Sequence, residues 1–86
     1  MKLEVLPEDI DGSGSFPRSR NCPVARAAVR CSGMEHAGVS WTGVSLWDGE
    51  EEKIFTGKHI PFPAVLSRII REYDRTGHMD PFGIEI

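Results

Sequence analysis

The segment NCPVARAAVRCSG, residues 21–33, carries the signals of a complete α-helix, and the rest of the predicted fold is arranged around it. Asn21 can cap the first turn, Pro23 suits a first-turn position, and Gly33 stands where a left-handed residue ends a helix. The expected buried stripe consists mostly of small side chains: Val24, Ala25, Ala28, Val29 and Cys31. Small side chains let a helix lie close to a sheet, so we expect this helix to pack against strands formed by the flanking sequence.

The residues before this helix predict one strand and one long loop. Leu3 and Val5 alternate with charged residues, the period of two that is typical of a half-buried strand, and Pro7 ends it. The segment from about residue 8 to residue 20 is rich in glycine, serine, aspartate and proline, and it has no helical or strand periodicity. We therefore expect a flexible loop over residues 8–20.

The residues after the helix predict a β-hairpin. Residues 39–57 contain Asp48 followed by Gly49, a strong signal for a tight turn, between flanks rich in β-forming residues. The alternation of the first flank slips at Gly43, which indicates either a bulge there or a strand that is buried on both faces.

A second helix over residues 64–77 and a final strand over residues 81–86 complete the predicted elements. The resulting order, β-α-β-β-α-β, matches a ferredoxin-like arrangement, in which two helices cover one face of an antiparallel sheet. We therefore predict a single small α+β domain over residues 1–86, with a ferredoxin-like or related strand order and with both chain termini in its sheet.

The composition is that of a folded protein with mixed charge. The 86 residues are 40% hydrophobic and 27% charged, with a net charge of −3, unlike chains that stay disordered. No apolar run approaches the roughly 20 residues that a membrane-spanning helix needs, and the first residues lack the apolar core of a secretory signal. We expect a cytoplasmic protein without membrane association. Its two cysteines, Cys22 and Cys31, should be reduced thiols, since one helix would hold them about 13 Å apart.

The segment DIDGSGSFPRSR, residues 9–20, resembles the front of a calcium-binding loop. Asp9, Asp11 and Ser13 occupy the first three ligand positions of an EF-hand, and Gly14 occupies its invariant glycine position. Position 12 requires a bidentate glutamate, but Arg20 stands there. We therefore predict no metal site and no other cofactor, and a calcium-binding loop is the weaker alternative.

Catalytic chemistry has little support in the sequence. Cys22 at a helix N-terminus would have a lowered pKa, which favours nucleophilic attack. The histidines that could serve as its base, His36, His59 and His78, lie in different segments and form no recognisable motif with it. We therefore predict a protein that is not an enzyme and has no catalytic residues.

Two clusters of charge suggest binding functions instead. An arginine-rich segment could bind single-stranded nucleic acid, because arginine pairs with phosphate and aromatic rings stack on bases; its residues are Phe16, Arg18, Arg20, Arg26 and Arg30. An acidic run at the predicted hairpin tip could meet a basic groove of a protein partner. The predicted partner-binding residues are this run and two nearby tryptophans: Asp48, Glu50, Glu51, Glu52, Trp41 and Trp47.

Over residues 21–86 the chain resembles a set of small orphan proteins encoded by bacteriophages and their bacterial hosts. The resemblance rests on the CPVARA helix, the aromatic-bearing hairpin, the IPFPA helix entry and the terminal PFGIEI strand. It brings no activity, cofactor or catalytic residue with it. It implies a phage or mobile-element product that binds and inhibits or modulates a host protein, such as a defence or nucleic-acid-handling complex. Single-stranded nucleic-acid binding remains the alternative.

Overall fold

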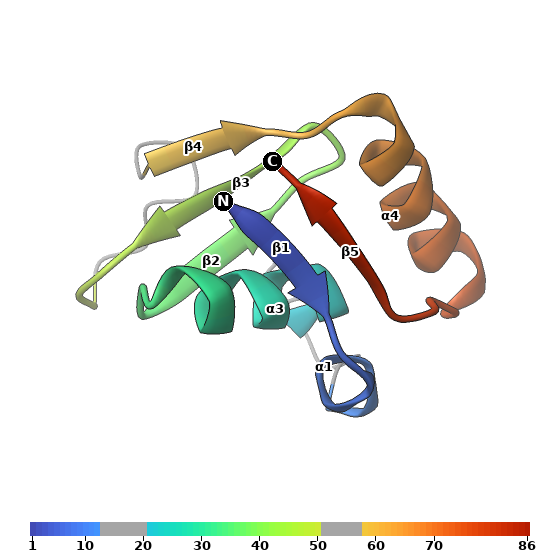
Figure 1. The fold of residues 1–86 in the computed structure, drawn as a ribbon, viewed down its shortest axis with the longest axis horizontal. Helices are drawn as coiled ribbons and strands as arrows, with labels where there is room; N and C mark the ends of the chain where they lie inside the picture. Colours follow the sequence, from blue (N-terminus) through green and yellow to red (C-terminus); the bar gives the residue numbers. More distant parts are fainter. Residues whose placement is uncertain (13–20, 51–57) are drawn as a thin grey trace.

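The computed structural model describes residues 1–12, 21–50 and 58–86, and these residues form an α+β fold of helices and antiparallel strands (Figure 1). The predicted fold class is therefore confirmed. The elements are β1 (Lys2–Val5), α1 (Pro7–Asp11), α3 (Pro23–Ser32), β2 (His36–Val39), β3 (Gly43–Trp47), β4 (Lys58–Pro61), α4 (Ala64–Thr76) and β5 (Phe82–Glu85).

The strands form two separate antiparallel sheets. β1 pairs with β5 from Lys2 opposite Glu85 to Val5 opposite Phe82, so both chain ends share a sheet, as predicted. The second sheet is a meander in the order β2-β3-β4. Among the strands of the described residues, β1 and β5 pair only with each other, so the predicted ferredoxin-like sheet, which would join all strands, is wrong.

The position predicted for the hairpin turn is also wrong. The first hairpin turn lies at residues 40–42, where the Ser40 N–H donates a 2.9 Å hydrogen bond to the Gly43 carbonyl. The slip in alternation at Gly43 therefore marks the start of a new strand. Asp48 and Gly49 follow β3. Because Leu46 pairs with Lys58, Asp48 and Gly49 belong to the long connection between β3 and β4 and not to a tight turn. Residues 51–57 of that connection lie outside the described residues.

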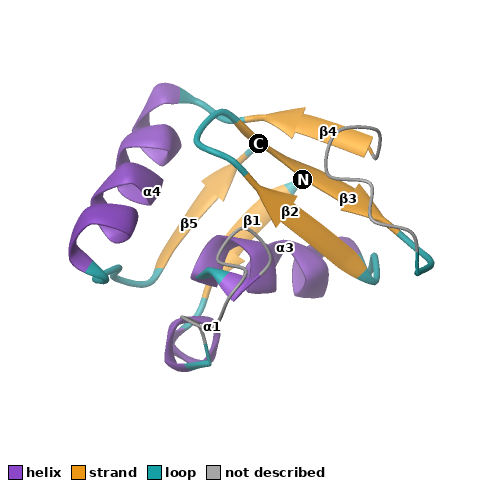
Figure 2. Ribbon diagram, turned by 180° about the vertical axis from the view of Figure 1, so that it is seen from behind, coloured by secondary structure: helices purple, strands orange, loops and turns teal. Residues whose placement is uncertain are grey.

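The core is built around α3, which contacts β1, β2 and β3. Its fully buried face consists of Val24, Ala25, Ala27 and Ala28, and these small side chains allow the close approach to strands that the sequence predicts. α4 contributes Leu66, Ile70 and Tyr73 to the same core. Figure 2 shows α3 and α4 as separate helices on different sides of the strands, so they do not form one helical layer.

The first part of the predicted loop is a short helix. α1 begins at Pro7, and the Leu6 N–H donates a 2.9 Å hydrogen bond to Asp9 Oδ2 at its N-terminus. The prediction of a flexible loop from residue 8 is therefore wrong for residues 8–11, because Pro7 starts a helix there as well as ending β1. Residues 13–20, the rest of that predicted loop, lie outside the described residues.

Candidate interaction surface

Trp41 occupies the turn between β2 and β3, and this turn is held against the start of α4. The Phe62 N–H, just before that helix, donates a 2.8 Å hydrogen bond to the Thr42 carbonyl. Trp41 and Val65 are the large hydrophobic residues that are exposed in the described part of the chain, with relative exposures of 50% and 51%. A half-exposed tryptophan on a fixed turn is therefore the most prominent apolar feature of this side of the protein.

Two charged side chains of α4 hold the Trp41 ring in place. The indole Nε1–H donates a 2.7 Å hydrogen bond to Asp74 Oδ2. The Arg71 guanidinium carbon lies 4.9 Å from the ring centroid, within the range of a cation–π contact. Because the indole N–H already has its acceptor, the remaining exposed surface of the ring is apolar and fixed in orientation. We call Trp41, Arg71 and Asp74 the Trp41 cluster.

Trp47, the second predicted partner-binding tryptophan, is buried. Only 3% of its surface is exposed, and its ring stacks at a tilt of 33° on His36 with the centroids 5.5 Å apart. The two residues face each other across β2 and β3. Trp47 therefore packs within the second sheet and offers little surface to a partner, because all five residues of β3 are buried, as expected of a strand that is covered on both faces.

The described residues of the predicted acidic run, Asp48 and Glu50, do not adjoin Trp41. Asp48 Oδ1 accepts a 2.9 Å hydrogen bond from the Glu35 N–H, and Glu50 is exposed. The five residues of β3 separate Asp48 from the turn that carries Trp41, a span of about 17 Å. Glu51 and Glu52, the other members of the run, lie outside the described residues.

Of the two arginines of α3, Arg30 is paired within the fold, whereas Arg26 is exposed and lies against Gly12. The Arg30 guanidinium binds Asp9 Oδ2 at 2.9 Å and the Glu4 carbonyl. The Arg26 guanidinium lies so close to Gly12 that a Cβ atom there would come within 2.2 Å of its Nη2 atom. Phe16, Arg18 and Arg20, the other residues of the predicted nucleic-acid site, lie outside the described residues.

The environment of Cys22 opposes nucleophilic reactivity. Cys22 is the N-cap of α3 in place of the predicted Asn21, and its Sγ atom accepts a 3.4 Å hydrogen bond from the Ala25 N–H. Burial raises the pKa of the Cys22 thiol, and this outweighs the lowering by the helix amides. The lowered pKa predicted from its helix-terminal position is therefore wrong.

The remaining candidate ligands are dispersed over the described residues. His36 stacks on Trp47, the His59 ring lies 3.5 Å from the Ser45 hydroxyl, and His78 contacts Asp80 at 3.1 Å. Within residues 1–12, 21–50 and 58–86, no group of three or more histidine, cysteine, aspartate or glutamate residues is arranged to hold a metal ion. None of the helices formed by these residues has the length and apolarity to cross a bilayer.

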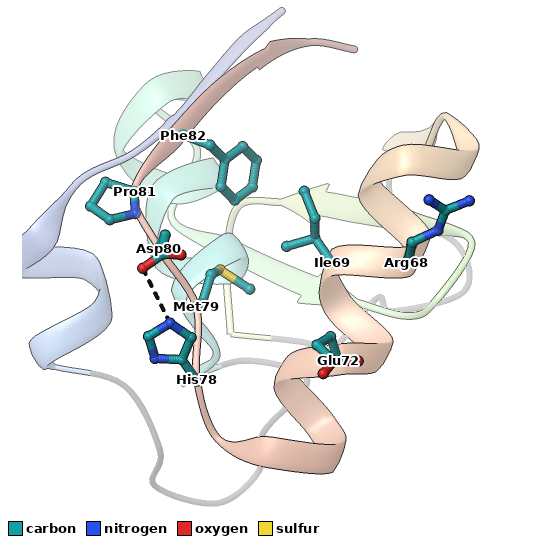
Figure 3. A pocket seen from close by; sticks show the side chains of 8 residues that line it. All are labelled: Arg68, Ile69, Glu72, His78, Met79, Asp80, Pro81 and Phe82. Atoms are coloured by element: carbon teal, nitrogen blue, oxygen red, sulfur yellow. Dashed lines mark hydrogen bonds and ion pairs between the residues drawn. The ribbon is translucent and has the colours of Figure 1, made fainter.

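A groove that the sequence does not indicate lies between α4 and the segment that leads into β5 (Figure 3). Its volume is about 400 Å³, and its lining residues are Arg68, Ile69, Glu72, His78, Met79, Asp80, Pro81 and Phe82. Ile69, Met79 and Phe82 point toward one another across it (Figure 3). The groove depends on the spacing between a helix and a strand, and no local sequence pattern reports that spacing.

Comparisons of the chain with protein-family models, with curated proteins and with solved structures find no match.

Proposed function

We propose that this chain is a non-enzymatic interaction protein that binds and modulates another protein, and that the Trp41 cluster makes the central contact. The observation that carries the proposal is a half-exposed tryptophan whose ring is fixed by Asp74 at 2.7 Å and by Arg71 at 4.9 Å. Tryptophan and arginine are enriched among the residues that dominate binding energies at protein interfaces. A ring that is already ordered loses little conformational entropy on binding.

The cluster favours a partner that offers an apolar pocket with a polar rim. The exposed part of the Trp41 ring can fill the pocket, while Arg71 and Asp74 remain at its edge and can bond to the rim. The resemblance to proteins of phages and their hosts supports a bacterial host protein as the partner. The acidic run, which includes the exposed Glu50, favours a partner with a basic surface nearby, such as a nucleic-acid-handling or defence complex.

Direct binding of single-stranded nucleic acid has weaker support. A phosphate-binding arginine needs a guanidinium that is free to face the strand. Arg30 is instead paired with Asp9, and Arg26 packs against Gly12.

The test is affinity capture from a lysate of the natural bacterial host, followed by calorimetry with the purified captured protein. The captured protein should bind the wild-type chain, and Trp41→Ala should weaken that binding by about 2 kcal/mol, or roughly thirtyfold in Kd. Val65→Ala is the matched control, because Val65 is as exposed as Trp41 but does not belong to the cluster.

The variants must first be shown to fold, since Trp41 also ties its turn to α4. Circular dichroism and urea unfolding of each variant test this. Trp41→Phe is the milder replacement, because phenylalanine keeps an aromatic ring under Arg71 and loses only the bond to Asp74. Equal binding by wild type and a folded Trp41→Ala variant would exclude the Trp41 cluster as the contact. Loss of stability without loss of binding would reduce Trp41 to a structural role.

A further inference from the structure

β5 has one edge that is not hydrogen-bonded to β1. The terminal residues Met1 and Ile86 exchange two hydrogen bonds, from the Met1 amino group to the Ile86 carbonyl at 2.7 Å and from the Ile86 N–H to the Met1 carbonyl at 2.9 Å. In an antiparallel pair, such bonded pairs alternate with non-bonded ones. The backbone N–H and C=O groups of Gly83 and Glu85 therefore point away from β1.

The contacts of β1 agree with this assignment. Glu4 lies opposite Gly83, and its carbonyl accepts a hydrogen bond from Arg30 on the far side of β1. It therefore also points out of the two-stranded sheet. Gly83 and Glu85 are exposed, so their outward backbone groups are accessible to another chain.

The groove lies on this free side of β5. Figure 1 shows α4 on the side of β5 away from β1, and Figure 3 shows the groove between them. The apolar side chains of Ile69, Met79 and Phe82 meet in the groove, and its volume of about 400 Å³ is within the range of known binding pockets. An apolar groove therefore runs beside backbone groups that can extend a sheet.

The charges at the rim favour an acidic ligand. Glu72 is paired with Arg75, and the His78 ring contacts Asp80 at 3.1 Å, which is an ion pair only when His78 is protonated. Arg68 also lines the groove, and it forms no hydrogen bond or ion pair with the described residues. Arg68 is thus left as an available cation beside Glu72, whose charge is already paired with Arg75.

We propose that this groove binds an extended peptide segment of a partner protein, which adds as a strand to the free edge of β5. The backbone of the segment bonds to Gly83 and Glu85, its alternate apolar side chains enter the groove, and one acidic side chain pairs with Arg68. The segment requires apolar residues at every second position, because alternate residues of a strand face the same side.

The position of α4 favours a single peptide strand over a second copy of this chain. In a dimer, the free edge of β5 in one copy would pair with the same edge in the other copy. In each copy, α4 lies on that side of β5. Two such edges brought together would place each helix in the path of the other strand. A segment that presents a strand without a flanking helix meets no such obstacle.

This site is separate from the Trp41 cluster. On α4 the groove uses Arg68, Ile69 and Glu72, whereas Trp41 contacts Arg71 and Asp74 on another helix face. The inference therefore stands whether or not the proposed contact at Trp41 is correct.

The test uses the full chain and an array of six-residue peptides with blocked ends. The peptides carry all pairings of valine, leucine, isoleucine and phenylalanine at alternate positions, with threonine and one glutamate between them. Array binders should shift the amide NMR signals of Gly83 and Glu85 in solution, and N-methylation of alternate peptide amides should abolish the shifts.

Three variants make the test specific. Glu85→Pro removes an outward N–H and should weaken binding about tenfold, whereas Glu85→Ala keeps that N–H and should bind like wild type. Glu85→Ala also controls for loss of the contact between Glu85 and the N-terminus, which lie 3.7 Å apart. Arg68→Glu should weaken binding of the peptides that carry glutamate. It should strengthen binding of the same peptides when lysine replaces that glutamate.

Three results would overturn the proposal. The first is an array without any binder that moves the Gly83 and Glu85 signals. The second is equal binding by folded Glu85→Pro and Glu85→Ala variants. The third is a dimer of the wild-type chain in sedimentation that Glu85→Pro converts to a monomer, since this would assign the edge to a second copy. Trp41→Ala should leave peptide binding unchanged, which separates this result from failure of the proposed function.

Discussion

Asp9 on α1 and Arg30 on α3 form an ion pair with 2.9 Å between Oδ2 and Nη2, although 21 positions separate them in the sequence. The same Oδ2 atom accepts the Leu6 N–H at the start of α1. Asp9 is buried, with 5% of its surface exposed. One carboxylate therefore holds the N-terminus of a short helix and joins that helix to α3.

Replacement of Asp9 should destabilise the fold measurably. Asp9→Ala removes both hydrogen bonds of a buried carboxylate and should lower the free energy of unfolding by about 1–3 kcal/mol. Asp9→Asn keeps an oxygen acceptor for Leu6 and should cost less. Urea unfolding followed by circular dichroism measures both changes. A stability of Asp9→Ala equal to that of wild type would show that α1 does not depend on this residue.

Two glycines in strands should differ sharply in their tolerance of alanine. A Cβ atom at Gly43 would lie 2.7 Å from the Ile60 carbonyl on β4 and 2.5 Å from the His59 ring. The backbone atom cannot yield easily, so Gly43→Ala should lower the free energy of unfolding by about 1–3 kcal/mol. At Gly83 the nearest atom would be 3.9 Å away, and Gly83→Ala should be nearly neutral. Equal unfolding midpoints for the two variants would contradict the close packing of β3 against β4.

The two cysteines should react at very different rates with a thiol reagent such as Ellman's reagent. Cys22 is buried and its thiol pKa is raised by burial, whereas Cys31 is only partly buried. Because the thiolate is the reactive form, Cys31 should be modified first at neutral pH. Faster modification of Cys22 in the folded protein, located by mass spectrometry, would contradict its buried position.

The raised pKa of Cys22 also predicts a loss of stability at alkaline pH. Above the ordinary pKa of a thiol, the unfolded chain releases the proton that the folded chain still holds, so rising pH favours unfolding. Cys22→Ser removes this titration and keeps an oxygen acceptor for the Ala25 N–H. Urea unfolding from neutral to alkaline pH should therefore show a smaller decline for Cys22→Ser than for wild type. Parallel declines would mean that other groups dominate.

Local signals in the sequence predict the C-terminal ends of α3 and α4 and the two terminal strands. Gly33 and Gly77 both end helices with φ at 75°, as their positions indicate, because glycine adopts this left-handed conformation without strain. The alternation at residues 2–5 and 81–86 likewise predicts β1 and β5. These features depend only on neighbouring residues.

The errors arise where the outcome depends on distant residues. The turn at residues 40–42 is marked only by Ser40, a weaker turn former whose hydroxyl accepts the Thr42 N–H, and it lacks the strong signal of an Asp-Gly or Asn-Gly pair. Asp48 and Gly49 carry that signal, but Asp48 instead bonds to the Glu35 N–H before β2. Likewise, the sequence alone predicts Trp41 as a contact residue, but it does not indicate that Asp74 and Arg71 contact the Trp41 ring, because these residues are brought together only by the fold.

The acidic run and Trp41 should affect partner binding through different rate constants. Asp48 and Glu50, the described residues of the run, follow the far end of β3 from Trp41, so we expect the run to steer association at the rim and not to hold the complex together. Glu50→Gln, Glu51→Gln and Glu52→Gln together should slow association severalfold at low salt and hardly at all at high salt, because salt screens exposed charges.

Asp48 is left unchanged in this variant because its carboxylate accepts the Glu35 N–H. Trp41→Ala should show the opposite pattern, with faster dissociation and a nearly unchanged association rate, because a central anchor acts after encounter. Stopped-flow fluorescence with the captured partner at about 20 mM and about 500 mM salt separates the two effects. An association rate of the triple glutamine variant equal to that of wild type at low salt would leave the acidic run with a role in solubility alone.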